Sequence, residues 1–500
     1  MKGASAVAAT AGRSSWRVDR LALLAVVCLA LIVRFHAIDV SSLWYDEAYS
    51  LVLARETPAR IWALTALDVH PPLYYVLLHY WVLLWGEGAL PARALSALVD
   101  VGTVLLCIKL MSLIATRRAT WMAAVLLALL PISVRYSQEA RMYTLLGFWL
   151  MGATVALVCW CNSPGRMRYP VIYVLLMTAA FYTHYLAALC VLTHWLFWWR
   201  SHRQESLVLS AGRWVMANGA IVLLFIPWLP SVFDQLAGKP YFGWIEPFTW
   251  RFVLLLVWQL TDGNEATNLL WQVWLALLLL ASVLSILSRP AKASRYNVLL
   301  LGYFFVPTGV LLFIAVTTPT FVPRYFQFAA IGIPLMLAVA LDDRWRSSRL
   351  LCAGVLACFL FGELYGLAAL TKVREANGRP DLLASGIQTQ SQQGDVIVVE
   401  NLFWYFPFTL YNHTGISPRI YVGSFATKLW GYPDRSGWAL VAQPDQSILG
   451  DDSLTELKAK RVWWITHTQK AEDLSLVSHR WKRAQTLSGG VIEARLFIAQ

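Results

Sequence analysis

Long apolar runs separated by short polar loops dominate the first three quarters of the chain. A helix needs about 20 mostly apolar residues to cross the ~30 Å hydrocarbon core of a bilayer. Eleven runs approach or exceed this length, namely 21–38, 91–114, 119–136, 141–161, 169–183, 185–200, 213–234, 269–288, 296–317, 325–341 and 350–370. The pattern predicts a polytopic α-helical membrane protein with about eleven transmembrane helices.

The run 71–86 is the ambiguous one, because it begins with two prolines and offers only about 14 apolar residues, which favours a helix lying at the interface. If it does not cross, the basic short loops fall on the same side as the N-terminus, and the positive-inside rule makes that side cytoplasmic. These loops carry Arg117, Arg118, Arg166, Arg168, Arg200, Arg203, Arg213, Arg289, Lys292, Arg295, Arg344, Arg346 and Arg349. We therefore expect a cytoplasmic N-terminus and an extracytoplasmic C-terminus.

Composition agrees with this class of protein. The chain is 58% hydrophobic and only 14% charged, which is typical of membrane proteins and not of soluble domains. Its net charge of +12 is largely accounted for by the inner loops, so it indicates orientation and not nucleic-acid binding. All seven cysteines lie in or beside the predicted spans, so no disulfide framework is expected outside the membrane.

The pattern changes at about residue 371. Segments 395–399 and 461–465 are typical of buried strands and 381–390 of a helix, with Gly-, Pro- and Asp-rich stretches between them. Two domains are predicted: a transmembrane module over 1–370, whose first outer loop spans 39–90 with the interfacial helix 71–86, and a small extracytoplasmic α/β domain over 371–500.

Five polar clusters stand out because each lies at the end of an apolar run. They are the segments 44–47, 70–72, 138–141, 183–185 and 323–325. The topology above puts all five on the outer side of the membrane. Polar groups that gather at one membrane boundary indicate a single site there.

Asp46 and Glu47 are the candidate acid–base groups. On an extended segment adjacent carboxylates point in opposite directions, so one could act as general base while the other orients a neighbour. In an arbitrary membrane protein, two solvated acids in an outer loop are the commoner explanation. His70 precedes a helix N-terminus, where an anion is stabilised, although a lone histidine is more often structural.

The other clusters supply cations and aromatic rings. Arg141 and Arg324 could each hold a phosphate bidentately, and Arg141 could equally snorkel to the interface. Glu139 and Tyr143 are four residues apart and are expected to share a helix face, as are Gln138 and Arg141. Together these groups suit transfer from a lipid-linked phosphate: Arg or His binds the phosphate, and a carboxylate deprotonates an acceptor hydroxyl.

The order and spacing of these residues resemble the GT-C superfamily of membrane glycosyltransferases, of the protein mannosyltransferase and lipid A aminoarabinose transferase type. The bacterial dolichyl-phosphate-mannose-protein mannosyltransferase-like branch is most similar. The resemblance covers roughly residues 20–345. Its residues are Asp46-Glu47, HisProProLeuTyrTyr at 70–75, Arg93 with Ser96, TyrSerGlnGluAlaArgMetTyr at 136–143, ThrHisTyr at 183–185 and ArgTyr at 324–325.

This resemblance implies an inverting transferase in a bacterial inner membrane that uses a polyprenyl-phosphate sugar on the extracytoplasmic face. The acceptor would be a hydroxyl of a glycan, lipid or protein. Asp46 is the implied base and Glu47 its neighbour in the site. The implied donor phosphate or sugar contacts are His70, Arg93, Glu139, Arg141, Tyr143, His184, Arg324 and Tyr325. No cofactor is implied; metal use varies in the family, and this chain shows no cluster that compels a metal.

Two other classes of function remain open from the sequence. A transporter or lipid-sugar flippase needs a polar path across the bilayer, and only Asp100, Lys109 and Glu363 could begin one. A catalytically silent scaffold with a sensing outer domain is the third reading. Because the ionisable residues gather at the outer edge and not near the midplane, the transferase is the leading hypothesis.

Overall fold

The computed structural model describes residues 3–203, 209–237, 245, 248–249, 269–290, 295–318, 321–375, 378–421, 436–441, 448–449, 457–469 and 481–500. The chain forms two compact units. Unit 1 comprises Met1–His36, Ala94–Pro227 and Phe242–Leu370, and unit 2 comprises Ala37–Arg93, Trp228–Tyr241 and Thr371–Gln500. Unit 2 thus combines the first outer loop with the C-terminal segment.

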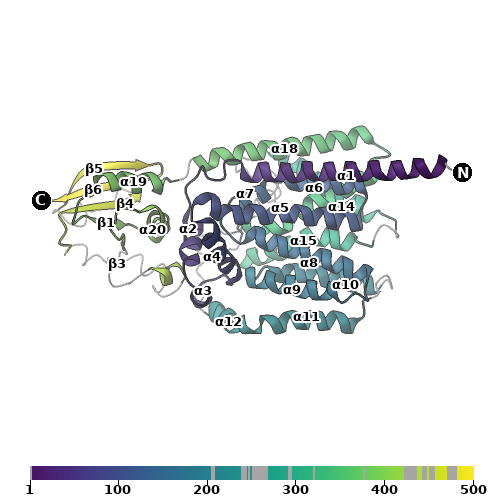
Figure 1. Ribbon diagram of the computed structural model, residues 1–500, viewed down its shortest axis with the longest axis horizontal. Coiled ribbons are helices and arrows are strands. Elements are labelled where there is room, and N and C mark those ends of the chain that lie inside the picture. Colours follow the sequence, from purple (N-terminus) through teal and green to yellow (C-terminus); the bar gives the residue numbers. More distant parts are fainter. Residues whose placement is uncertain are drawn as a thin grey trace. The chain divides into compact units, whose positions relative to one another are not determined.

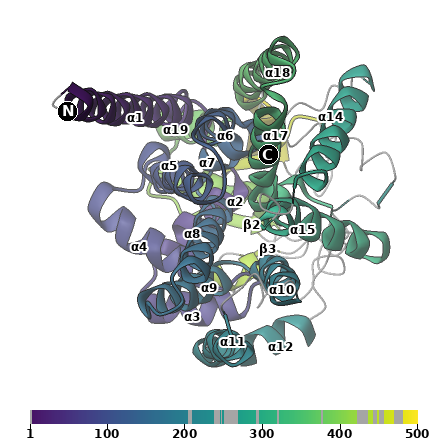
Figure 2. The ribbon, with the colours of Figure 1, turned by 90° about the vertical axis from the view of Figure 1, so that its right-hand side faces the viewer.

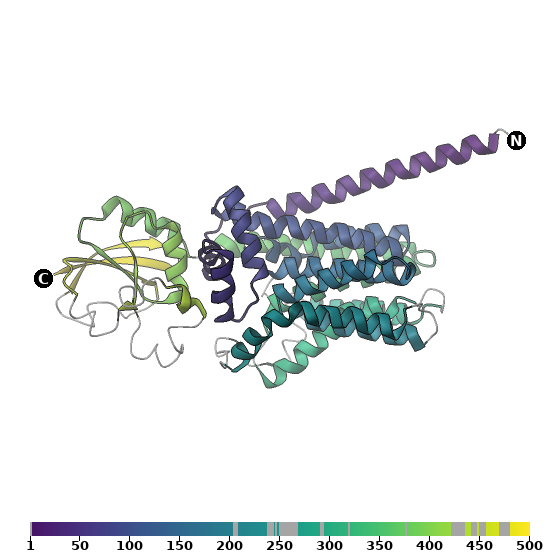
Figure 3. The same cartoon turned by 60° about the horizontal axis from the view of Figure 1, so that its bottom comes forward.

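Unit 1 is built of helices. They are α1 (Gly3–Phe35), most of α5 (Ala89–Ile114), α6 (Arg117–Leu129), α7 (Pro131–Ser137), α8 (Tyr143–Asn162), α9 (Arg168–Thr183), α10 (Ala187–Arg203), α11 (Ala211–Phe225), α14 (Leu269–Leu287), α15 (Asn297–Thr317), η3 (Pro323–Phe326), α16 (Gln327–Ala330), α17 (Gly332–Arg344) and most of α18 (Arg349–Glu375). Figure 2 looks close to along the axes of several of these helices, such as α8, α9 and α11. Figure 3 shows α1 as one continuous helix.

Helical structure lies on each of the eleven segments predicted as spans. By length and apolar composition alone, six helical segments in the described part of the chain can cross a membrane. A seventh results if α6 and α7, which are bent by 52° at their junction, are counted as one span. The protein is therefore built as an integral membrane protein, and the count of eleven crossings stays a prediction.

A buried ion pair holds the bend between α6 and α7. Pro131 has no N–H to offer the preceding turn, and the Arg34 guanidinium of α1 donates instead to Leu127 O at 3.4 Å and Ala128 O at 2.8 Å. The same guanidinium pairs with Asp100 of α5 at 2.7 Å. This partner of Asp100 was not identifiable from the sequence.

The outer-loop part of unit 2 consists of short helices. They are α2 (Tyr45–Ala54), α3 (Pro58–Ala66), α4 (Leu73–Trp85) and, from a later segment, α12 (Leu229–Ala237), with η1 (Ile226–Trp228) reaching it. The helix predicted over 71–86 is present as α4, with 13 residues. Pro71 and Pro72 precede it and set its start.

The C-terminal part of unit 2 is an α/β domain with a mixed sheet, and its elements are labelled in Figure 1. They are α19 (Pro380–Gln390), β1 (Val396–Val399), α20 (Leu402–Tyr411), β2 (Arg419–Tyr421), η4 (Ser436–Leu440), β3 (Ile448–Leu449), β4 (Arg461–His467), β5 (Trp481–Gly489) and β6 (Ile492–Ala499). The two predicted strands and the predicted helix are confirmed as β1, β4 and α19.

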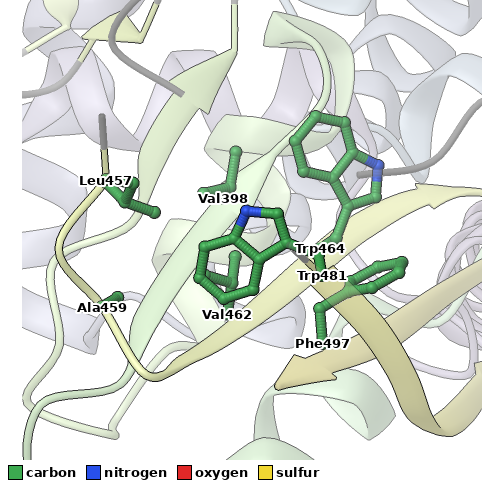
Figure 4. Close-up of a cluster of buried hydrophobic side chains, with 7 residues drawn as sticks. All are labelled: Val398, Leu457, Ala459, Val462, Trp464, Trp481 and Phe497. Carbon is green, nitrogen blue, oxygen red and sulfur yellow. The ribbon is translucent and has the colours of Figure 1, made fainter. Parts of the chain in front are cut away.

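The sheet order is β3-β2-β1-β4-β6-β5. The first four strands are parallel, with Val398 opposite Trp464, and β6 and β5 continue the sheet antiparallel. Strands β1 and β4 lie at the centre and are almost wholly buried, which explains their continuous apolar sequence. One face carries a core of Val398, Leu457, Ala459, Val462, Trp464, Trp481 and Phe497 (Figure 4).

Candidate functional site

Asp46 and Glu47 lie in the first turn of α2, so the expectation of an extended segment is wrong. Trp44 is the N-cap in extended conformation, and its backbone N–H donates to Glu47 Oε2 at 3.3 Å. This is how a glutamate at the third helical position closes a capping box. Both carboxylates also gain from the positive end of the helix dipole, which is the physical reason why a helix begins here.

Glu47 is fully buried and forms a doubly hydrogen-bonded ion pair with Arg93. Arg93 Nε donates to Glu47 Oε1 at 2.7 Å, and Nη2 donates to Oε2 at 2.6 Å. The exposed fractions are 0% for Glu47 and 2% for Arg93. Asp46, in contrast, is only half-buried. The two neighbouring carboxylates therefore have different environments.

Arg93 also orders the chain that leads to α2. Its Nη1 donates to Ile38 O at 2.7 Å and to Ser41 O at 2.9 Å, and its Nη2 donates to Ser42 O at 3.2 Å. One guanidinium thus satisfies three carbonyls of an irregular segment that would be costly to bury unpaired. The structure places Arg93 against Glu47 and this loop.

The C-terminal domain contacts the same loop within unit 2. Ser42 Oγ donates to Asp381 Oδ1 at 2.5 Å, and Leu43 N donates to the Tyr411 hydroxyl at 3.0 Å. Asp381 is paired with Arg379 at 2.6 Å. Burial alone would raise the pKa of Asp381, but the hydrogen bonds from Arg379 and Ser42 outweigh it and lower that pKa. The sequence contained no signal for these contacts.

Aromatic rings join α2 to α20. Tyr45 stacks on Phe403 with ring centroids 5.6 Å apart and packs against Phe406 at 5.9 Å, while Tyr49 meets Phe406 edge-on at 5.9 Å. A β-carbon at position 437 would lie only 2.6 Å from the Tyr45 hydroxyl, so Gly437 permits this close approach. The helix that carries Asp46 is therefore packed directly on the C-terminal domain.

His70 lies beside a buried carboxylate that our sequence reasoning did not single out. Asp68 Oδ2 is 3.8 Å from His70 Nδ1 and accepts a hydrogen bond from the Tyr49 hydroxyl at 2.9 Å. Burial opposes the charge on Asp68, but the interactions with His70 and the bond from Tyr49 outweigh it and lower its pKa. Burial, and then the charge of Asp68, raise the pKa of Tyr49 well above its usual range.

The remaining predicted site residues belong to unit 1. Residues 138–142 form a turn between α7 and α8, so the expected helix faces shared by Glu139 with Tyr143 and by Gln138 with Arg141 are wrong. The Gln138 amide donates to the carbonyls of Val33, Arg34 and His36 at 3.2, 2.8 and 2.9 Å. These bonds fix the turn and end the helix before Glu139.

Tyr143, His184 and Tyr325 surround one another although they come from three separate segments. Their ring centroids are 6.1 Å apart for Tyr143 and His184, 6.5 Å for Tyr143 and Tyr325, and 5.8 Å for His184 and Tyr325. His184 Nδ1 accepts from Leu186 N at 3.2 Å, which leaves the proton of a neutral ring on Nε2. An aromatic cluster of this kind can face a sugar or an anionic group.

The predicted charged residues of unit 1 are Arg141, Glu139 and Arg324. Arg141 is buried, and its carbonyl accepts from Ser96 Oγ at 3.1 Å. Glu139 and Arg324 both lie near the Tyr136 hydroxyl, and all three are at least partly buried. Tyr136 in turn packs against Tyr143 with ring centroids 5.7 Å apart. Unit 1 therefore brings together five predicted residues, Glu139, Tyr143, His184, Arg324 and Tyr325, and Arg141 lies in the turn just before Tyr143. Unit 2 brings together Asp46, Glu47 and Arg93, with His70 linked to α2 through Asp68 and Tyr49.

Within the described ranges no three His, Cys, Asp or Glu side chains are placed to hold a metal ion. Of the carboxylates of the first outer loop, Glu47 is paired with Arg93, and Asp68 contacts Tyr49 and His70.

Comparisons with known proteins were made at the levels of sequence and structure. No protein-family model matches this sequence, and a search of curated proteins gave no match. The fold, however, is similar to that of ArnT from Cupriavidus metallidurans in the apo state, with a TM-score of 0.63 at 14% identity over 97% of this chain and 98% of that one. The same protein bound to undecaprenyl phosphate gives a TM-score of 0.62 at 15% identity over 95% and 97%.

A second solved structure has a similar fold. The archaeal oligosaccharyltransferase AglB from Archaeoglobus fulgidus, in complex with an inhibitory peptide and a dolichol-phosphate, gives a TM-score of 0.54 at 13% identity. The match covers 97% of this chain and 74% of that one. The chain therefore shares its fold with these two proteins, in agreement with the resemblance found in its sequence.

Proposed function

We propose that this protein transfers a sugar from a polyprenyl-phosphate donor to a hydroxyl of a glycan, lipid or protein acceptor on the extracytoplasmic face of the membrane. The observation that carries the proposal is the pair of unequal carboxylates at the start of α2. Glu47 is buried and neutralised by Arg93, while Asp46 is half-buried beside it. The GT-C fold, shared with an ArnT structure bound to undecaprenyl phosphate, supports a lipid-phosphate donor.

In this proposal Asp46 is the general base. Its carboxylate takes the proton of the acceptor hydroxyl, the acceptor oxygen attacks the anomeric carbon, and the bond from that carbon to the phosphate oxygen breaks. Attack opposite the leaving group inverts the anomeric configuration. The polyprenyl phosphate leaves with the bonding electron pair and needs no carboxylic acid to protonate it, unlike the leaving group in glycoside hydrolysis.

Most of the remaining predicted residues are proposed to bind the donor, and Arg93 is proposed to stabilise the protein around Glu47. His70, Arg141 and Arg324 are proposed to bind the donor phosphate, since cationic hydrogen-bond donors stabilise a developing negative charge. Tyr143, His184 and Tyr325 are proposed to face the sugar, and Glu139 to bind its hydroxyls. Arg93 would act by holding Glu47 and the loop before α2. Assignment of both groups of residues to one reaction rests on the sequence pattern.

The experiment compares purified wild-type protein with Asp46→Asn, using a panel of polyprenyl-phosphate sugars and a membrane glycolipid extract. The matched control is Asp39→Asn, which removes an exposed carboxylate from the same outer segment. We expect wild type and the control to consume one donor, and Asp46→Asn to lose turnover by about 10²–10⁴-fold while it still binds undecaprenyl phosphate. Equal consumption by all three proteins would remove Asp46 from the chemistry.

A transporter of lipid-linked sugars predicts a different result in the same assay. It would move the donor across vesicle membranes without forming a glycosylated product, and Asp46→Asn would leave that movement unchanged. Of the residues from which a transport path could begin, Asp100 is held in a buried ion pair with Arg34. This pairing gives Asp100 a structural explanation.

A further inference from the structure

We propose that Asp68, which accepts a hydrogen bond from the Tyr49 hydroxyl, is a positioning residue for His70. It keeps the imidazole protonated and orients Nδ1 toward its own carboxylate, so that Nε2–H can donate to the donor phosphate. This inference rests on the function proposed above and assigns a role to Asp68 and Tyr49. The geometry that carries it is a chain of three side chains from α2 and the loop before α4.

The first link fixes Asp68. It lies in the loop between α3 and α4 and is only 7% exposed. The Tyr49 hydroxyl donates to its Oδ2 at 2.9 Å, and Tyr49 is on α2, two residues after Glu47. Because a buried phenol next to an anion keeps its proton, Tyr49 is the donor in this bond. The backbone N–H of Asp68 donates to Thr65 O at 3.1 Å, which fixes the start of the loop.

The second link requires a positive charge. A buried carboxylate is costly unless a counter-charge compensates it, and a phenol supplies a hydrogen bond but no charge. His70 Nδ1 lies 3.8 Å from the same Oδ2, and its side chain is only 12% exposed. At this separation an anion favours the imidazolium over the neutral ring. Asp68 therefore holds His70 both in its orientation and in its charged form.

The neighbouring titratable groups are consistent with this assignment. In unit 2 the groups that act on Asp68 are His70 of its own loop and Tyr49 of α2. Those that act on Tyr49 are Asp68, Tyr75 of α4 and Tyr45 of α2. All of these except Asp68 and His70 are phenols, which are uncharged near neutral pH. Asp68 and His70 are thus the two groups of this set that can carry a charge near neutral pH.

The third link is the orientation of the ring. With Nδ1 turned toward Asp68, Nε2 lies on the opposite side of the imidazole ring. A protonated ring carries N–H on both nitrogens, so His70 presents a charge-assisted donor on the side away from Asp68. Such donors bind phosphate oxygens more strongly than neutral ones. Without Asp68, the ring would lose its proton over the range around its ordinary pKa of about 6.5.

The test measures binding of undecaprenyl phosphate by the full-length protein from pH 5.5 to 8.5. The variants are Asp68→Asn, His70→Arg and the double variant, and Glu87→Gln is the matched control, since it removes an exposed carboxylate of the same outer loop. We expect Asp68→Asn to weaken binding by about 3- to 10-fold at pH 7.5, because each unit by which the His70 pKa falls can cost up to tenfold of the protonated form. At pH 5.5 the loss should be under twofold.

The double variant separates charge from structure. A permanent cation in His70→Arg no longer depends on Asp68, so adding Asp68→Asn to it should change binding at pH 7.5 by less than twofold. A loss in Asp68→Asn that is equal at every pH, and that His70→Arg does not relieve, would show a merely structural role and overturn the inference. So would an Asp68→Asn variant that binds like Glu87→Gln. If wild type fails to bind undecaprenyl phosphate at any pH, the proposed function itself fails.

Discussion

Arg93 and Glu47 meet through two short hydrogen bonds, Nε to Oε1 at 2.7 Å and Nη2 to Oε2 at 2.6 Å, in a place where neither side chain is exposed to solvent. The pair joins the first turn of α2 to the start of α5. Both oxygens of Glu47 are therefore engaged with one guanidinium. This pairing is why the function proposed above assigns the base to Asp46 and not to Glu47.

Arg93→Met should destabilise the protein strongly. Removal of one partner of a buried ion pair leaves the other charge uncompensated, at a cost of about 3–5 kcal/mol. The comparison is with Arg55→Met, whose ion pair with Glu87 has partners 43% and 44% exposed and should contribute at most about 1 kcal/mol. Unfolding of the two variants by denaturant or by heat, in the same detergent, measures the difference in stability. Equal stability would show that Arg93 does not hold Glu47.

The Tyr411 hydroxyl should control the order of the loop before α2. Tyr411→Phe removes the acceptor of the Leu43 N–H and should cost about 1 kcal/mol. The effect should appear as faster hydrogen exchange over 41–47, with little change in the central strands β1 and β4. Tyr365→Phe is the control, because Tyr365 is an exposed tyrosine of α18. Unchanged exchange over 41–47 would mean that the C-terminal domain does not support this loop.

Unit 2 should become less stable at acid pH, because Asp68 then becomes protonated. Its pKa is lowered in the folded protein, so its contribution is fully present above the ordinary aspartate pKa of about 3.9 and is lost as pH falls through the lower folded value. The melting temperatures of wild type and Asp68→Asn should therefore differ most near neutral pH and converge below about pH 4. A gap that widens on acidification would contradict the direction of this shift.

Arg34→Met should destabilise unit 1 without abolishing donor specificity. It leaves Asp100 charged and buried, and it deprives the carbonyls beside Pro131 of their donor, so we expect a loss of about 3–5 kcal/mol. Lys109→Met on the exposed side of the same α5 should cost under about 0.5 kcal/mol. Thermal unfolding compares the two. If Arg34→Met instead changed which donor is consumed at unchanged stability, the ion pair would belong to the site.

Much of the architecture was predictable because the bilayer permits few solutions. A spanning segment must satisfy its own backbone hydrogen bonds and present about 20 apolar residues, so every predicted span coincides with helical structure. The strands at 396–399 and 461–467 were equally clear, since a continuous β-branched and aromatic run is typical of a buried parallel strand. The predicted helix faces at 138–143 were wrong because α7 ends at Ser137, where the Gln138 side chain bonds to carbonyls of residues 33–36.

The sequence by itself determined the class of fold, the polar clusters at the ends of apolar runs and the resemblance that names Asp46. These features depend on neighbours within a few residues or on the demands of the membrane. Only the tertiary structure decided the partners: Glu47 with Arg93 across 46 positions, and Ser42 with Asp381 across 339. No local pattern encodes such contacts, because they depend on the path of the folded chain. That path buries Glu47 against Arg93, whereas Asp46 is only half-buried.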